Sequence, residues 1–262
     1  MKYVVIFILL TAAASCKKGS DNGPTPPAVL RDGLYVNGYM GTGTLSNSGV
    51  AAPAGYQWSE CQNDLGSSTV SNFSVGVSNY FNAFASYKLA DDFIVPAGQT
   101  WKISRVSVYA MPNFLSNGIF DSLRIQIWKG SPAVAGSTVV FGDMTTNTLS
   151  TVVDSMTCAI QNSSVPAPGI TPVTIYKVKK LSADINTTLS PGTYWLVYQA
   201  HLQDGNDCGS PYAKVKGKRG LPEWNAVVFN AFNIWQPVVD RGIPTTYPAV
   251  PLDVPFEIVY KY

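Results

Sequence analysis

The sequence predicts an all-β protein, a two-sheet antiparallel β-sandwich of the jelly-roll type. From Leu34 onward, short apolar segments with a period of two residues follow one another, and clusters of Gly, Pro, Asn and Ser separate them. No apolar stripe with helical spacing extends beyond two turns. The 22 glycines, 18 prolines and 12% aromatic residues are typical of many short strands joined by turns.

Composition narrows the class of protein. Of the 262 residues 46% are hydrophobic, which is enough to bury a core and argues against a disordered chain. Basic and acidic residues number 18 and 16, so the charge is nearly balanced, and no basic block is present. We therefore expect no nucleic-acid partner.

The N-terminus has the pattern of an export signal. Lys2 precedes the apolar run 4–10, and small residues fill 11–15 directly before Cys16. The small residues before Cys16 resemble the lipobox of bacterial lipoproteins, in which that cysteine carries the lipid. The resemblance implies a signal peptide at 1–15, a lipid anchor on Cys16 and a place at the outer membrane, on the cell surface or the periplasmic face. The alternative is an ordinary secretory signal with Cys16 in a disulfide.

Residues 16–30 form the next expected element. Gly and Pro in this segment disfavour a helix and cannot fill a core, so we expect a flexible tether. No linker interrupts the chain beyond it, and residues 31–262 are predicted to form a single domain.

The expected strands follow from alternation of apolar and polar residues. Leu123, Ile125 and Ile127 point to one face, whereas 194–199 is apolar on both faces and predicts an interior strand. The apolar phase slips between Ile103 and Val106, which predicts a β-bulge near Ser104 and Arg105. Strands are expected at 34–36, 87–95, 101–108, 123–128, 138–142, 149–156, 173–181, 194–199, 227–235 and 256–260.

Three cysteines remain after Cys16, and in an oxidising compartment two of them can pair. Cys61 and Cys208 both lie in polar stretches rich in turn residues, so we expect a Cys61–Cys208 disulfide. Other pairings with Cys158 stay open, since an unpaired buried thiol packs like a small hydrophobe.

Asp91 and Asp92 are the most prominent acidic pair. One of the two carboxylates with nearby carbonyls would suit a calcium ion, although no calcium-loop motif supports this. The alternative is that one aspartate accepts backbone N–H groups while Phe93 fills the core. A hydrolase using a carboxylate pair is a further possibility, but neighbouring strand residues point to opposite faces.

Other catalytic signals are absent from the sequence. His201 is the single histidine, and no G-x-S-x-G, H-E-x-x-H or C-x-x-C motif occurs. We therefore expect no zinc, no haem and no enzymatic activity.

Aromatic residues are more suggestive. Tyr212, Trp224 and Trp235 lie in a stretch that is predicted to contain a long loop, with Asn225 and Gln236 beside the tryptophans. An exposed ring can stack on a pyranose while neighbouring amides bind its hydroxyls. These three residues are the predicted glycan-binding residues. The alternative is that the rings belong to the core, as we expect for Trp101, Trp128 and Trp195.

Six short motifs occur in a characteristic order. They are 58–60 (WSE), 89–103 (LADDFIVPAGQTWKI), 125–130 (IQIWKG), 140–143 (VFGD), 189–196 (LSPGTYWL) and 255–258 (PFEI). Together they resemble uncharacterised extracellular β-sandwich modules common in Bacteroidetes. The resemblance implies a β-sandwich and assigns no catalytic residue.

The sequence thus predicts a lipid-anchored envelope protein that binds glycan without catalysis. The alternatives are a structural or adhesive surface protein that contacts other proteins, and a hydrolase with a carboxylate pair.

Overall fold

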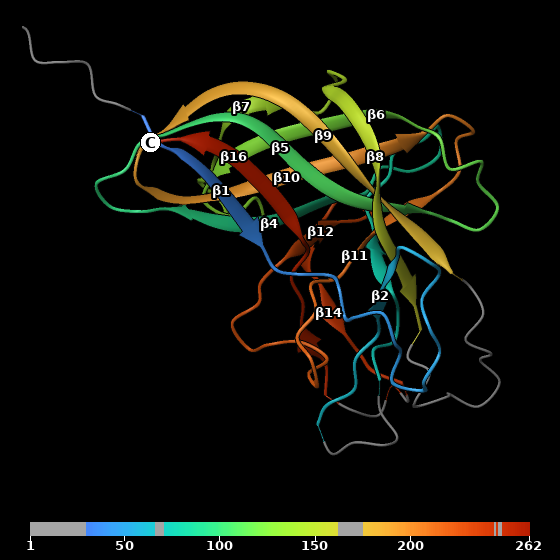
Figure 1. Cartoon of the computed structure of the whole chain (residues 1–262). Coiled ribbons are helices and arrows are strands. Elements are labelled where there is room, and N and C mark those ends of the chain that lie inside the picture. Colours follow the sequence, from blue (N-terminus) through green and yellow to red (C-terminus); the bar gives the residue numbers. More distant parts are fainter. Residues whose placement is uncertain (1–29, 66–70, 162–174, 244, 246–247) are drawn as a thin grey trace, which may run out of the picture. The chain divides into compact units, whose positions relative to one another are not determined.

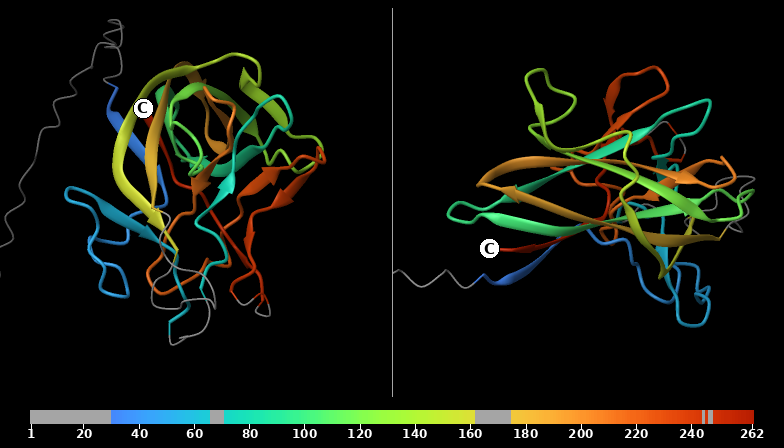
Figure 2. Two further views of the ribbon diagram at one scale, coloured as in Figure 1. Left: turned by 90° about the vertical axis from the view of Figure 1, so that its right-hand side faces the viewer. Right: turned by 90° about the horizontal axis from the view of Figure 1, so that it is seen from above.

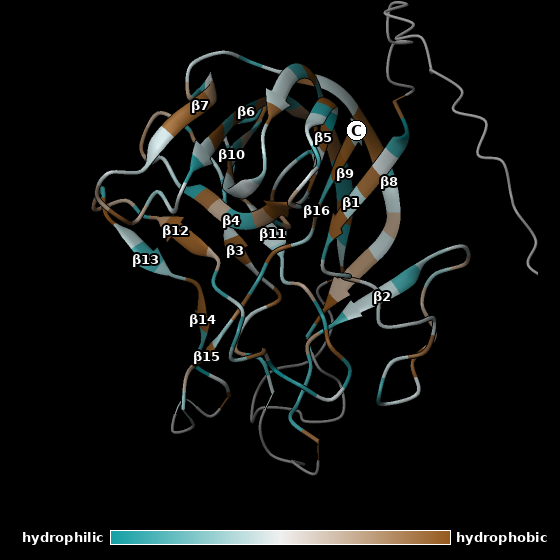
Figure 3. Cartoon of the chain, turned by 90° about the vertical axis from the view of Figure 1, so that its left-hand side faces the viewer, coloured by the Kyte–Doolittle hydropathy of each residue, from teal (hydrophilic) through white to brown (hydrophobic). Residues whose placement is uncertain are grey.

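Alternation of apolar and polar residues produces the strands of the computed structural model, which describes residues 30–65, 71–161, 175–243, 245 and 248–262 (Figure 1). In β6 (Phe120–Lys129), Leu123, Ile125 and Ile127 are fully buried and the intervening side chains are partly exposed. Figure 3 shows apolar and polar stretches following one another along β1 and β4 as well. This pattern places one face of each strand in the core.

The described residues contain strands and no helix. The other strands are β1 (Asp32–Asn37), β2 (Gln57–Glu60), β3 (Gly76–Ser78), β4 (Lys88–Val95), β5 (Trp101–Pro112), β7 (Thr138–Asp143), β8 (Leu149–Ile160), β9 (Tyr176–Leu189), β10 (Gly192–Leu202), β11 (Cys208–Pro211), β12 (Val227–Phe229), β13 (Trp235–Pro237), β14 (Val239–Asp240), β15 (Val250–Pro251) and β16 (Phe256–Lys261).

Two sheets pack against each other, as predicted. One has the order β1-β16-β5-β9-β8-β2, with β11 and β3 joined to β5, and the other has the order β13-β12-β4-β10-β6-β7. In the left view of Figure 2 the first sheet forms one wall and the second sheet the opposite wall. The prediction of a β-sandwich is confirmed.

The core lies between these sheets and is rich in aromatic rings at one end. Trp101 stacks on Tyr260 with ring centroids 3.7 Å apart and on Phe93 at 6.1 Å. The Tyr260 ring also covers Gly33, where an added Cβ would come within 2.4 Å of the ring. A glycine is therefore required at position 33 for this ring to lie across β1.

Two details of the predicted strands are confirmed. The pairing of β5 with β9 shifts register between Ile103 and Arg105, which is the predicted bulge. β10 pairs with β4 on one side and β6 on the other, and eight of its eleven residues are buried, so it is the expected interior strand.

Other details differ from the prediction. The segment 227–235 is not one strand but the hairpin of β12 and β13, because Asn233 adopts a positive φ of 61° in the connecting turn. β2, which the sequence did not predict, joins the edge of its sheet by parallel pairing with β8.

The segments 38–64, 71–75, 214–223 and 239–243, here called the loop region, occupy the lower part of Figure 1 around β2 and β14. This region buries polar side chains. Arg219 is 3% exposed and contacts two carboxylates, Asp64 at 3.1 Å and Asp240 at 3.2 Å. These ion pairs connect segments that are far apart in the sequence.

Residues Arg31–Tyr262 form one compact unit. The predicted signal peptide, Cys16 and the tether up to residue 29 lie outside the described residues. In the part of the chain that is described, no helix has the length and apolar character needed to cross a membrane.

Candidate functional site

A cavity opens where the chain leaves β1. Gly38 turns the chain out of the strand with a φ of 69°, a conformation that glycine adopts without strain. The carbonyl of the next residue, Tyr39, then accepts a hydrogen bond of 2.5 Å from the backbone N–H of Lys214. This contact holds the segment that carries Tyr39 against the loop region.

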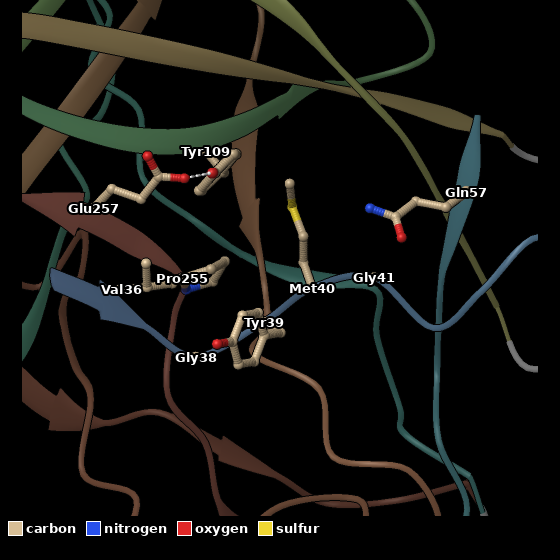
Figure 4. Close-up of a pocket in the computed structure, with 9 residues that line it drawn as sticks. All are labelled: Val36, Gly38, Tyr39, Met40, Gly41, Gln57, Tyr109, Pro255 and Glu257. Carbon is tan, nitrogen blue, oxygen red and sulfur yellow. Dashed lines mark hydrogen bonds between the residues drawn. The ribbon is translucent and has the colours of Figure 1, made fainter. Parts of the chain in front are cut away.

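The cavity, here called the Tyr39 pocket, has a volume of about 340 Å³. Figure 4 shows its walls, which come from the end of β1 and the following segment, from β2, from β5 and from the start of β16. The lining residues are Val36, Gly38, Tyr39, Met40, Gly41, Gln57, Tyr109, Pro255 and Glu257. Tyr39 is 75% exposed, so its ring can meet a ligand with little loss of packing.

Gln57 supplies an amide to this pocket. Its Nε2 donates to Thr157 Oγ1 at 3.3 Å, and its Oε1 lies against Gly41. A Cβ at position 41 would approach that oxygen to 2.3 Å, so the glycine makes room for the amide.

Glu257 supplies a carboxylate from the opposite wall. It accepts hydrogen bonds from the Tyr109 hydroxyl and from Lys180 Nζ, the latter at 2.5 Å. Burial of the Tyr109 hydroxyl and its bond to the Glu257 carboxylate raise the pKa of Tyr109 above its ordinary value of 10. The tyrosine therefore stays protonated and fixes one carboxylate oxygen.

The pocket thus combines an exposed aromatic ring with an amide and a carboxylate that are held in place. Pyranose ligands are recognised by a ring that stacks on their apolar face and by planar polar groups that bind their hydroxyls. The arrangement suits a neutral, hydroxyl-rich ligand.

Of the predicted glycan-binding residues, Tyr212 and Trp224 belong to the main core cluster and Trp235 to another cluster. Tyr212 is only 7% exposed and packs in the main core, so the prediction of an exposed Tyr212 is wrong. It follows β11 directly and lines a separate cavity of about 400 Å³, to which Gln236 also contributes. Trp224 is half-buried against the same core, whereas Trp235 packs on a separate cluster.

That second cluster lies on the outer face of the sheet that contains β10. Trp235 packs there with Trp195 and Trp128, and its ring meets Phe229 edge-on at 5.3 Å. Packing of Trp101, Trp128 and Trp195 is confirmed. Trp235 was predicted to expose its ring to a ligand, but the ring packs against neighbouring side chains.

Asp91 points into the interior and Asp92 to the other face of β4, as expected for neighbouring strand residues. Asp91 is fully buried and accepts from the Val254 N–H at 2.9 Å and from Asn37 Nδ2 at 2.8 Å. Burial raises the pKa of Asp91 well above its usual range. The interpretation of Asp91 as a backbone acceptor is supported, because N–H donors occupy its oxygens.

The calcium site at Asp91 and Asp92 stays a prediction. Among the described residues, no group of three His, Cys, Asp or Glu side chains is placed to hold a metal ion. When its amide is rotated so that the nitrogen faces the carboxylates, Asn225 donates to Asp91 Oδ1 and Asp92 Oδ1 at 3.2 Å each.

His201 also has a structural partner. Its Nδ1 lies 2.6 Å from Asp121 Oδ1, and its ring packs on Phe81 at 5.0 Å.

The predicted Cys61–Cys208 disulfide is not formed. Cys61 Sγ donates to the Ser74 carbonyl at 3.2 Å, and Cys208 Sγ donates to Asn79 Oδ1 at 3.4 Å. Both thiols are buried, as is that of Cys158. The polar sequence around Cys61 and Cys208 suggested exposed turns, but the fold buries both residues and gives each thiol an oxygen acceptor.

Sequence reasoning missed Tyr39. The signal that marks it is an aromatic residue between two glycines directly after a strand, Gly38 and Gly41, which indicates a ring on an exposed turn. Gln57 and Glu257 carry no comparable signal, because their proximity arises from pairing of distant strands.

Comparison with protein-family models, with curated proteins and with solved structures finds no match to this chain.

Proposed function

We propose that this chain is a binding protein of the bacterial envelope that holds a saccharide in the Tyr39 pocket. The observation that carries the proposal is the 75% exposed ring of Tyr39 beside an amide and a carboxylate. The ring stacks on one face of a sugar, Gln57 donates to a hydroxyl, and Glu257 accepts from another. None of these steps needs a catalytic group.

The N-terminal sequence supports the envelope location. Lys2, the apolar run 4–10 and the small residues before Cys16 favour export and lipidation. Substituting Cys16→Ser should move the protein from the membrane fraction to the soluble fraction, and an unchanged distribution would contradict the lipid anchor.

A glycan array followed by calorimetry tests the sugar pocket. We expect Tyr39→Ala to weaken binding of the best glycan at least tenfold, because stacking on an aromatic ring is lost. Gly41→Ala should weaken it as well, since the added Cβ displaces the Gln57 amide.

Matched controls separate this pocket from the aromatic residues predicted from sequence. Phe232→Ala removes an aromatic side chain that is 83% exposed and lies outside the pocket, and it should leave affinity unchanged. Trp224→Ala and Trp235→Ala should also retain binding. Loss of binding only in the tryptophan variants, or no glycan bound by the wild type, would overturn the proposal.

A second candidate function is protein contact through apolar loop tips. Phe84 is 96% exposed, Phe114 73% and Leu115 70%. Their loops are linked by hydrogen bonds, from Asn82 Nδ2 to the Gly205 carbonyl and from Ser116 Oγ to Asp204. In Figure 1 these loops lie at the end of the sandwich away from the C-terminus.

Clustered exposed apolar side chains are typical of interaction sites. The variant Phe84→Ser/Leu115→Ser should abolish adhesion or self-association in sedimentation experiments while glycan binding persists. Unchanged association would remove this candidate.

A further inference from the structure

A second cavity lies in the loop region beside the Tyr39 pocket. It has a volume of about 240 Å³ and shares Gly41 with that pocket. Its lining is polar and consists of Gly41, Thr42, Asn47, Glu60, Gln62, Lys214 and Lys216. Because a water occupies about 30 Å³ of liquid, there is room for a small organic molecule.

Lys214 is the unusual member of this lining. The residue is only 8% exposed, and its Nζ lies 5.5 Å from the centroid of the Tyr212 ring but has no hydrogen-bond partner, although an ammonium carries three donors. An unpartnered buried charge is costly, so buried lysines are normally paired. Burial lowers the pKa of Lys214 from its ordinary value.

The other polar groups of the cavity indicate the charge of a ligand that could bind the Lys214 ammonium. Both carboxylate oxygens of Glu60 accept from the Asn47 backbone N–H, at 2.9 and 3.2 Å. The cavity holds two lysines against one glutamate. One positive charge is therefore in excess.

We propose that this cavity binds a small monocarboxylate, whose oxygens accept hydrogen bonds from the Lys214 ammonium. A singly charged anion balances the excess charge of the lining, whereas a dianion such as phosphate would face Glu60 with a second uncompensated charge. Lys216, which is exposed, lies at the rim and assists entry by long-range attraction. Thr42, Asn47 and Gln62 surround the remainder of the acid with hydrogen-bonding groups.

This site is independent of the saccharide proposal. Its ligand needs no aromatic surface, and Tyr39 does not line the cavity. An experiment can therefore contradict one of the two binding proposals without contradicting the other.

Calorimetry at constant ionic strength tests the proposal, with acetate and lactate as probes and inorganic phosphate as the comparison. We expect one site per chain for acetate or lactate, and weaker binding of phosphate. Lys214→Met, which keeps the length of the side chain and removes its charge, should reduce affinity for the acid at least tenfold. Lys218→Met changes an exposed lysine outside the cavity and should have no effect.

A second measurement applies if Lys214→Met fails to fold. Wild-type protein is labelled with an amine-reactive ester, and mass spectrometry follows modification of Lys214 with and without acetate. The acid should slow labelling of Lys214 at least threefold and leave Lys218 unchanged. Equal labelling with and without acid, retained affinity in Lys214→Met, no binding of either acid, or tighter binding of phosphate would each overturn the proposal.

Discussion

The interior of the sandwich and the loop region are both buried, but they bury opposite kinds of side chain. The interior is filled by aliphatic and aromatic residues such as Phe93, Trp101 and Leu196. The loop region instead buries Glu60, Arg219 and other polar groups. The first is stabilised by removal of apolar surface from water, and the second depends on hydrogen bonds and ion pairs that offset the cost of burying charge.

This difference predicts how each region responds to substitution. An apolar interior loses stability in proportion to the volume removed, because a cavity remains. A polar region fails when one partner is removed, because the other is left unpaired in a site that excludes water.

The largest effect is expected for Trp101→Ala in the interior. Trp101 is 2% exposed and stacks between Phe93 and Tyr260, so its removal leaves a large cavity. We expect a loss of about 4 kcal/mol in the free energy of unfolding, measured in urea. Trp128→Ala, at a half-buried ring on the outer cluster, should cost clearly less; equal losses would show that the interior is not the dominant source of stability.

The next largest effect is expected for Arg219→Met in the loop region. The change leaves Asp240, which is 2% exposed, without its cation, and we expect a loss of about 3 kcal/mol. Adding Asp240→Asn should restore part of the loss, since the amide oxygen still accepts from the Phe73 N–H. A double variant as unstable as Arg219→Met would show that the charge is not the cause.

The same contrast explains how much the sequence could predict. Period-two alternation depends only on neighbouring residues, so the strand around Leu123, the interior strand β10 and the bulge near Arg105 were all predictable. Arg219 lies in the stretch that the sequence predicts to contain a long loop. Its burial depends on Asp64 and Asp240, which lie 155 and 21 residues away in the sequence.

The candidate site was less predictable for the same reason. Tyr212 and the tryptophans were recognised by composition, which does not distinguish an exposed ring from a packed one. Glu257 and Gln57 meet Tyr39 only after β16 pairs with β5 and β2 pairs with β8. Such a site becomes visible only when strand order is known.

A smaller effect is expected from pH, which should change the free energy of unfolding in opposite directions through Asp253, whose pKa is raised, and Asp204, whose pKa is lowered. Burial raises the pKa of Asp253 from 3.8 to about 6, so the folded state binds this proton more tightly than the unfolded chain. Stability should therefore fall as the pH rises from 4 to 6 and stay reduced above it. Asp253→Asn cannot ionise and should therefore remove this loss of stability. We expect the loss to be only about 1 kcal/mol, because the half-exposed carboxylate keeps part of its hydration.

Asp204 is the matched control for that measurement. Hydrogen bonds from the Asn117 N–H and from neighbouring donors lower its pKa to about 2, so its contribution is present above pH 4 and is lost as the pH falls. Asp204→Asn should change the acid limb of the stability profile and leave the range from pH 4 to 6 as in the wild type. If Asp204→Asn changed stability only between pH 4 and 6, the lowered pKa of Asp204 and the assignment of that pH range to Asp253 would both be contradicted.

The smallest effect is expected for Arg105→Ala, which sharpens the comparison between buried and exposed charge. Arg105 Nε lies 2.7 Å from Asp184, closer than Arg219 lies to either of its carboxylates, but both side chains of this pair are about half exposed to solvent. Water solvates each charge when the partner is removed, so a shorter distance brings no larger stabilisation. The midpoint of urea unfolding should be unchanged within error at low and at high salt. A shift comparable to that of Arg219→Met would mean that contact distance, rather than exclusion of water, determines what an ion pair contributes in this protein.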